Sequence, residues 1–279
     1  MPTLRERIQW HGHIMGCLLA YRSHYRNWRD WVQLLLCYTA HTAAGSVGIR
    51  NARWRVRLPG DPNPVDLRLG STDFHALLEI FFADVYGFAV PSLKALPGGV
   101  RAVVDLGANA GYTVRLWSRL FPGCRVVAVE PDAENLKLCM ANGMPAAPGA
   151  IQGVRCFVGG KAGVGFLDRS LGSWAYRLTT VIPDAGQEEP TPVRTVPEIL
   201  SETPFADAQI DLLKCDIEKA KAEVFRGGPK WLLRVRAIVA EVHPPYTADA
   251  LAADVRSAGG AWAVTSLGNV VLLVRASPG

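Results

Sequence analysis

The sequence has no long apolar run: no stretch of its 279 residues approaches the roughly 18 apolar residues that a membrane-spanning helix needs. Its 27 glycines and 19 prolines follow no fixed period, which excludes a collagen-like or low-complexity chain. None of its six cysteines forms a CxxC pair, and metal binding at His11, His13 or His75 is not expected, so no metal site is predicted. The cysteines lie in apolar runs, as buried reduced thiols do, and a cytoplasmic location is expected.

Positive charge gathers in the first quarter of the chain. Residues 1–68 hold ten arginines and four acids, a net charge of +6, whereas the remainder carries about one net negative charge. A solvated helix surface accounts for this bias. Contact with phosphates or with a membrane face is the alternative, because charge alone says little about partners.

Two helices are predicted within residues 3–42. His11 and His13 interrupt the apolar part of the first helix, which favours a helix over a signal peptide. The second helix, over about 25–42, carries apolar side chains at near-helical spacing, and such a stripe usually packs on its own chain. A partner-facing or lipid-facing surface is the alternative, since tryptophan and arginine also mark interfacial helices. The stripe consists of Trp28, Trp31, Val32, Leu35 and Tyr38.

A β-hairpin is predicted next, because the turn-rich segment 59–64 lies between two stretches of alternating residues. A helix capped by Ser71 or Thr72 is expected to run to about Tyr86, and residues 91–99 are interpreted as a linker. The expected organisation is a helical extension over 1–50, a hairpin with a capping helix over 51–97, and a main domain over 98–279.

From residue 100 onward, predicted strands alternate with predicted helices. The strands are 100–106, 125–129, 154–158, 210–215 and 237–242, with an insertion over 163–196 and a closing pair at 262–266 and 270–275. The expected fold class is α/β, a doubly wound, mainly parallel, seven-stranded Rossmann-like sheet with an antiparallel C-terminal strand. In such sheets, ligands bind at the carboxyl ends of the strands.

Two of these strand ends carry acids at a spacing that suggests a ligand. The first strand runs into V-D-L-G-A-N-A-G, where Gly107 and Gly111 permit a sharp turn close to a ligand and Asp105 lies just before it. The second strand ends at Glu130, which is placed to accept both hydroxyls of a ribose. The middle glycine that a dinucleotide needs is replaced by Asn109. A ligand with a ribose and a positive centre fits better than NAD, and S-adenosylmethionine is such a ligand.

Four segments of the chain carry a family likeness. They read R-L-G-S-T-D over 68–73 with Tyr86, V-D-L-G-A-N-A-G-Y over 104–112, V-E-P over 129–131 with Asn135, and D-L-L-K-C-D-I-E over 211–218 with E-V-H over 241–243. Together they resemble the FkbM family of S-adenosylmethionine-dependent methyltransferases, and the resemblance covers about residues 53–245. It implies that fold and that cofactor. Together with the strand-end analysis, it assigns the cofactor contacts to Asp73, Tyr86, Asp105, Gly107, Asn109, Gly111, Tyr112, Glu130, Pro131, Asn135 and Asp216.

The sequence departs from the family pattern after the fourth predicted strand. The family usually continues D-x-E-G-x-E, whereas Lys219 and Lys221 stand here in place of the glycine and the second acid. Both positions lie beside the expected reaction centre. The change affects either the choice of substrate or the level of activity.

Candidate catalytic residues follow the fourth and fifth predicted strands. His243 is the first candidate for a general base, because histidine ordinarily titrates near neutrality, and Asp216 and Glu218 are the next candidates. Glu241 is expected to orient a neighbour. The stretch His243-Pro244-Pro245-Tyr246 resembles the N/D-P-P-Y motif of amino-group methyltransferases, but it follows the fifth strand and lacks the amide or carboxylate oxygen.

The resemblance implies methylation of a hydroxyl on a glycan, glycolipid or secondary metabolite. Two alternatives remain open at this point. The first is a binding or scaffold protein that kept the fold without turnover, which the two lysines suggest. The second is methylation of RNA, which the basic N-terminus suggests but for which the sequence carries no strong signal.

Overall fold

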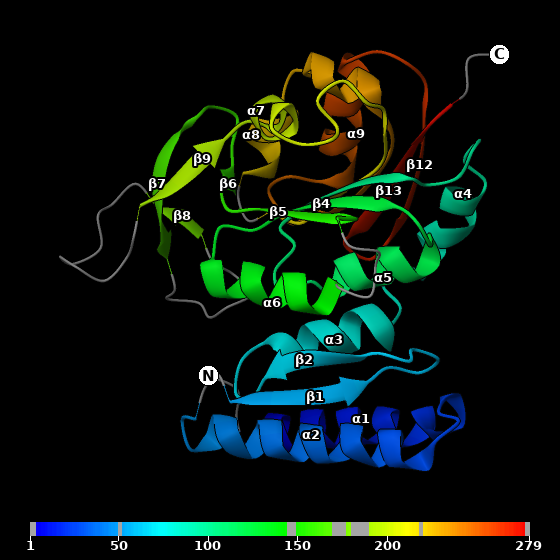
Figure 1. The fold of residues 1–279 in the computed structure, drawn as a ribbon, viewed down its shortest axis with the longest axis vertical. Helices are drawn as coiled ribbons and strands as arrows, with labels where there is room; N and C mark the ends of the chain where they lie inside the picture. Colours follow the sequence, from blue (N-terminus) through cyan, green and yellow to red (C-terminus); the bar gives the residue numbers. More distant parts are fainter. Residues whose placement is uncertain are drawn as a thin grey trace. The chain divides into compact units, whose positions relative to one another are not determined.

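The computed structural model describes residues 4–49, 52–143, 149–168, 177–179, 190–217 and 220–276 (Figure 1). It divides into two compact units, Met1–Phe82 and Ala83–Gly279, called here the first and the second unit. The boundaries expected at residues 50 and 97 stay predictions. Within the described residues, no helix combines the length and the apolarity that crossing a bilayer requires.

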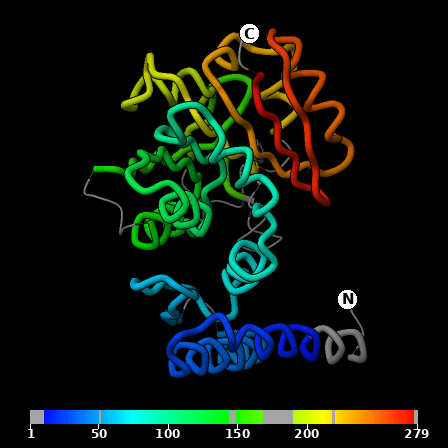
Figure 2. Tube along the Cα trace, turned by 90° about the vertical axis from the view of Figure 1, so that its right-hand side faces the viewer, coloured from blue at the N-terminus to red at the C-terminus, as the bar shows by residue number. Residues whose placement is uncertain are grey.

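The first unit combines a helical hairpin with a β-hairpin. Its two long helices lie side by side in both views (Figures 1 and 2), and the indole of Trp31 donates a hydrogen bond from one to the carbonyl of Leu18 on the other. Asn27 caps the second helix by accepting from the amide of Arg29. The elements are α1 (Leu4–Ala20), η1 (Tyr21–His24), α2 (Trp28–Ser46), the antiparallel pair β1 (Arg53–Arg57) and β2 (Pro64–Arg68), and α3 (Asp73–Phe81).

The second unit is built on a seven-stranded sheet with the order β12-β13-β11-β10-β3-β4-β5. Five strands are parallel, and β13 runs antiparallel to both of its neighbours. This topology confirms the predicted doubly wound fold. The strands are β3 (Ala102–Leu106), β4 (Arg125–Val129), β5 (Ile151–Val154), β10 (Ile210–Cys215), β11 (Val235–Glu241), β12 (Trp262–Leu267) and β13 (Val270–Arg275).

Helices cover both faces of this sheet (Figure 1). One face packs on α7 (Val196–Ser201), α8 (Lys221–Phe225) and α9 (Ala248–Ser257), whose apolar side chains share a core with those of the central strands. On the other face lie α5 (Tyr112–Leu120) and α6 (Ala133–Gly143). The central strands β3 and β10 are buried along their whole length, which explains their nearly continuous apolar sequences.

Three local predictions were wrong. The helix expected to reach Tyr86 ends at Phe81, and Asp84 then adopts a left-handed backbone conformation with φ +50° that no helix accommodates. The expected linker over 91–99 begins with α4 (Val90–Lys94), because proline is tolerated in the first turn of a helix. The third predicted strand, 154–158, is divided between two sheets, since β5 ends at Val154.

The residues after β5 form a separate small sheet. It has the order β6-β9-β7-β8, and its strands are β6 (Phe157–Val158), β7 (Gly163–Asp168), β8 (Arg177–Thr179) and β9 (Thr191–Arg194). The remaining short elements of the second unit are η2 (Gly87–Ala89) and η3 (Lys230–Arg234).

Two glycines are required for different reasons. At Gly123 only the backbone conformation requires glycine, whereas at Gly111 a close contact with a neighbouring helix requires it as well. Both have φ +84°, but a Cβ on Gly111 would lie 2.5 Å from the Cα of Cys139 on α6, whereas a Cβ on Gly123 would meet nothing within 4 Å. We expect Gly123→Ala to cost about 1 kcal/mol of unfolding free energy, from backbone strain alone. Gly111→Ala should cost about 1–3 kcal/mol more, because the two helices must separate. Urea unfolding of both variants measures the difference, and equal losses would contradict this close approach.

Candidate active site

The candidate site lies where four parallel strands of the second unit end. The turn after β3 is tied to its neighbours on both sides: the amide of Gly107 donates to the carbonyl of Val129 over 3.0 Å, and the amide of Asp216 donates to that of Leu106 over 2.9 Å. The carboxyl ends of β3, β4 and β10 are thereby fixed at one edge. This is the edge at which ligands bind in sheets of this kind.

The turn between β3 and α5 is held in a left-handed conformation at three positions. Gly107 and Gly111 have φ +81° and +84°, and Asn109 has φ +47°. The amide of Asn109 donates to Oε2 of Glu130 over 3.0 Å, and its own side-chain Oδ1 is buried with no hydrogen-bond partner. An orphaned buried acceptor in a strained turn is a feature that a bound ligand would satisfy.

Asp105 is completely buried at the end of β3 and is held by two other side chains. Its Oδ1 lies 3.1 Å from Nζ of Lys214 on β10, and its Oδ2 accepts from the hydroxyl of Thr113 over 2.5 Å. Lys214 also donates to the carbonyl of Gly107 over 2.7 Å. Burial, the largest single influence, lowers the pKa of Lys214, but the combined effect of Asp105, Tyr86 and Asp216 outweighs it, so the pKa is raised and the ammonium stays charged.

Glu130 is buried at the end of β4 and accepts three hydrogen bonds. Besides the amide of Asn109, the donors are the amide of Asp132 and Nδ2 of Asn135, each 3.1 Å from Oε1. Burial raises the pKa of Glu130 to about 7, although these donors oppose the shift. Asn135, in the first turn of α6, therefore orients the Glu130 carboxylate.

The aromatic residues assigned to the cofactor lie within the core of the second unit. Tyr86 is buried with its ring 5.6 Å from that of Trp117, and burial raises its pKa. A contact of the Tyr86 hydroxyl with the cofactor stays a prediction. Tyr112 is buried in the first turn of α5, and Pro131 is half-buried just after β4.

Asp73 has a partner within the first unit. Its buried carboxylate accepts hydrogen bonds of 2.8 Å from the backbone amide, Nε and Nη2 of Arg68. The pair closes the turn between β2 and α3. A contact of Asp73 with the cofactor stays a prediction.

A second cluster of charges follows β10 and β11. Asp216 is half-exposed, and Nζ of the buried Lys221 lies 3.3 Å from its Oδ1. The other two charged residues predicted here, Glu218 and Lys219, lie outside the described residues. The structure thus shows that one of the two lysines that depart from the family pattern neutralises a candidate catalytic acid.

Glu241 and His243 form a pair at the end of β11. His243 Nε2 lies 3.2 Å from Oε1 of Glu241, and Nδ1 lies 3.4 Å from Nδ2 of Asn269 in the turn between β12 and β13. Burial, followed by the charge of Asp216, raises the pKa of Glu241. With Asn269 donating to Nδ1, the ring proton resides on Nε2 and points at Glu241, as in an oriented catalytic base.

Sequence reasoning did not single out three residues that build the site. Lys214, Thr113 and Asn269 contact Asp105 or His243 directly. A signal existed only for Lys214, a lysine inside the otherwise apolar strand I-D-L-L-K-C. Its pairing with Asp105 depends on the register between β10 and β3, in which the two residues stand opposite each other.

The family model for the methyltransferase FkbM domain matches residues 105–260, which include all four strand ends described above. The chain belongs to the FkbM methyltransferase family. S-adenosylmethionine is accordingly the cofactor of this FkbM methyltransferase. Among curated proteins, none matches the chain.

Several solved structures are similar to this FkbM methyltransferase. The METTL16 MTase domain is 15% identical with a TM-score of 0.42, over 68% of this chain and 65% of that one. Precorrin-6y C5,15-methyltransferase from Geobacter metallireducens is 14% identical with a TM-score of 0.39, over 68% and 87%. A human methyltransferase 10 domain containing protein is 13% identical with a TM-score of 0.36, over 68% and 78%.

The residues of the carboxyl edge fit S-adenosylmethionine. Glu130 is a buried carboxylate with acceptor capacity left beyond its three donors, and Asn109 Oδ1 is an unpartnered acceptor in the same turn. The neighbouring acid Glu241 is not paired with a lysine or an arginine among the described residues, and its carboxylate suits a ligand with a positive centre. We therefore place the cofactor's ribose at Glu130 as a proposal, and its contacts with the other predicted residues stay predictions.

Removing Lys214 should destabilise the second unit strongly. Lys214→Met leaves the Asp105 carboxylate buried and unpaired, which we expect to cost about 3–5 kcal/mol of unfolding free energy. The double variant Asp105→Asn/Lys214→Met should lose less than the sum of the single losses, since no buried charge remains. Arg55→Met, which breaks an exposed pair with Asp66, should change little and serves as the control. Additive losses in urea unfolding would contradict the coupling.

Cofactor affinity should depend on pH through Glu130. The ionised carboxylate accepts ribose hydroxyls, and with a pKa of about 7 its ionised fraction grows as pH rises. Binding should therefore tighten about tenfold from about pH 6 to about pH 8. Glu130→Gln should remove this step and weaken binding roughly ten- to a hundredfold at the higher pH.

Calorimetric titration with S-adenosylmethionine across this pH range measures both effects. The matched control is Glu134→Gln, which changes an exposed glutamate in the first turn of α6 and should leave the pH profile intact. An unchanged affinity in Glu130→Gln would show that the ribose lies elsewhere.

Proposed function

We propose that this FkbM methyltransferase methylates a hydroxyl oxygen on a glycan, glycolipid or secondary metabolite. The contact between Glu241 and His243 carries the proposal, because an alcohol is a poor nucleophile at neutral pH and benefits from a base. When bound, S-adenosylmethionine supplies a methyl group on a sulfonium, which is already a good leaving group. The protein must then position the acceptor and take one proton.

His243 is suited to take that proton. Its side chain is 46% exposed, so a substrate can reach it, and the contact of Nε2 with Glu241 fixes the orientation of the ring. The acceptor hydroxyl would take the place of Asn269 at Nδ1 and pass its proton to that nitrogen as the oxygen gains the methyl group and the methyl–sulfur bond breaks, while Nε2–H stays hydrogen-bonded to Glu241. The carboxylate stabilises the resulting imidazolium, which is the role of the acid in Ser-His-Asp sites.

The stretch that resembles an amino-group methyltransferase motif has another role here. The hydroxyl of Tyr246 donates to Oδ2 of Asp254 on α9 over 2.8 Å, so this side chain anchors the loop to the helix. His243 replaces the amide or carboxylate that would accept from an amine. This arrangement supports oxygen over nitrogen as the acceptor atom.

A second candidate is binding of the cofactor without turnover. The ion pair between Lys221 and Asp216 favours it, because it occupies a carboxylate that could otherwise face the acceptor. Tight binding of S-adenosylmethionine with no methyl transfer to a broad panel of acceptors would support this candidate. The expected cytoplasmic location stays a prediction, to which the five buried free cysteines lend support.

Turnover should depend on His243. With a labelled methyl donor and a panel of alcohols, glycans, amines and RNA, we expect transfer to oxygen. His243→Ala should lower turnover about a hundredfold or more with unchanged cofactor affinity, and Glu241→Gln should lower it less. Asp216→Asn tests the other candidate base, and His13→Ala is the control.

Two results would contradict the proposal. Transfer to amines or RNA but never to oxygen would exclude the acceptor class. Near-parental rates in both His243→Ala and Asp216→Asn would exclude a base at either position and leave catalysis by positioning alone.

A further inference from the structure

The solvent side of α2 carries several exposed apolar side chains, with Thr39 and Ser46 among them. Trp28, Val32, Leu36, Ala43 and Val47, called here the α2 stripe, follow one another at steps of four or seven residues and so lie along one face of the helix. Trp28, Leu36 and Val47 are 56%, 54% and 70% exposed. The opposite face carries the buried residues of α2, so the first unit packs on that face and leaves the stripe in water.

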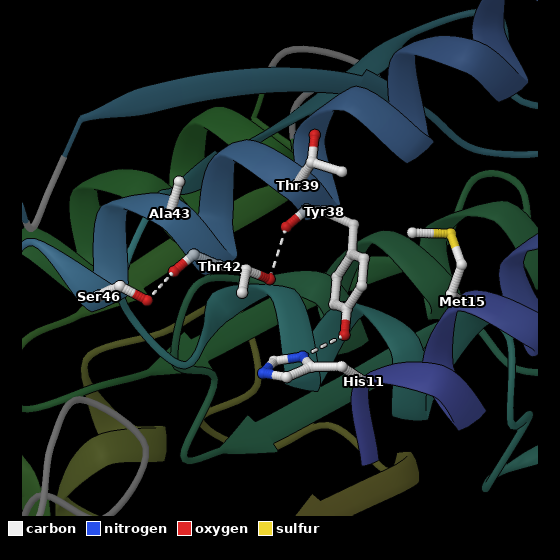
Figure 3. A pocket seen from close by; sticks show the side chains of 7 residues that line it. All are labelled: His11, Met15, Tyr38, Thr39, Thr42, Ala43 and Ser46. Atoms are coloured by element: carbon white, nitrogen blue, oxygen red, sulfur yellow. Dashed lines mark hydrogen bonds between the residues drawn. The ribbon is translucent and has the colours of Figure 1, made fainter. Parts of the chain in front are cut away.

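A pocket opens beside the stripe, between α1 and α2 (Figure 3). It has a volume of about 350 Å³ and is lined by His11, Met15, Tyr38, Thr39, Thr42, Ala43 and Ser46. Its hydroxyls are already engaged: that of Tyr38 lies 2.6 Å from Nδ1 of His11, and those of Thr42 and Ser46 donate to carbonyls one turn earlier. The pocket therefore offers mainly apolar surface, and it meets the stripe at Ala43.

Three exposed arginines stand at one end of the stripe: Arg22, Arg26 and Arg29. The guanidinium of Arg29 lies 5.9 Å from the ring centroid of Trp28. Within the described part of the chain, no carboxylate lies within ion-pair distance of these three, and the nearby Asp30 is paired with Arg57 over 3.7 Å. The surface thus combines apolar side chains, an exposed indole and uncompensated positive charge.

We propose that this face of the first unit binds an anionic lipid surface. The α2 stripe would lie at the boundary between headgroups and acyl chains, and the arginines would contact the anionic headgroups. RNA would engage the arginines but leave the stripe in water. A second copy of the chain would cover the stripe but bring no exposed carboxylate from α2 to the arginines. The inference is independent of the acceptor proposed above.

Flotation of the full chain with vesicles tests this inference. We expect binding to vesicles of phosphatidylglycerol and phosphatidylcholine, weaker binding at high salt, and little binding to phosphatidylcholine alone. Leu36→Glu should lower the partition coefficient at least about tenfold. Arg26→Gln/Arg29→Gln should lower it about thirtyfold.

Matched changes in the second unit serve as controls. Leu233→Glu alters a side chain that is 52% exposed on η3, and Lys137→Gln/Lys161→Gln removes two exposed positive charges. Both should bind vesicles as the parent does, and circular dichroism with cofactor titration verifies that every variant is folded. Equal losses in Leu36→Glu and Leu233→Glu, or no dependence on anionic lipid, would overturn the proposal.

Two further measurements test whether RNA or a second copy of the chain binds this face instead of lipid. A labelled RNA hairpin is titrated at low and high salt, and light scattering gives the mass of the chain in solution. Salt-sensitive RNA binding without vesicle binding would overturn the proposal in favour of RNA. A dimer that Leu36→Glu dissociates, again without vesicle binding, would overturn it in favour of a second copy.

Discussion

A buried ammonium–carboxylate pair between the two central strands determines the geometry of the whole carboxyl edge. Lys214 meets Asp105 across the β10–β3 register and also binds the carbonyl of Gly107, so one side chain fixes both strands and the start of the turn. The turn also presents the amide of Asn109 to Glu130, and this hydrogen bond links the turn to the end of β4. A shift of this pair would therefore move the turn after β3 and its contact with Glu130. Such a pair costs desolvation, and its benefit here is a defined position more than stability.

The edge holds more acid than base, and this imbalance suits its ligand. Among the described residues, Lys214 and Lys221 form ion pairs with Asp105 and Asp216, whereas Glu130 and Glu241 form none with a lysine or an arginine, and burial raises the pKa of each. A ligand with a positive centre lowers the cost of ionising such carboxylates, and they in turn favour its charge. Lys221 takes part of that attraction away from Asp216. Its position among the acids gives a physical reason why a departure from the family pattern would alter the reaction.

Strand ends were predictable from the sequence, whereas partners across strands were not. Asp105, Glu130 and Glu241 follow apolar runs, so their places at the edge could be inferred from patterning alone. The pairing of Asp105 with Lys214 depends on register, and the contact of Asn269 with His243 depends on which strands become neighbours. The helix expected to reach Tyr86 ends early for a local reason, the left-handed residue Asp84, and the general tolerance of aspartate for this conformation does not single out one position in a sequence. Asp73 was assigned from a motif, and the structure shows a partner, Arg68, that the motif does not reveal.

The two-sided apolar character of α2 explains why its role could not be derived from spacing. Trp28 and Tyr38 were expected on one packed face, but Tyr38 is buried and Trp28 is exposed. The helix has apolar residues around most of its circumference, so periodicity does not decide which side the fold covers. Folding of the first unit buries the side with Leu34 and Cys37 and leaves the other in water. A chain that only needed a stable helical hairpin would gain solubility from polar residues at Leu36 and Val47. Their exposure beside arginines that form no ion pair within the described residues is the feature on which the proposed lipid-binding surface rests.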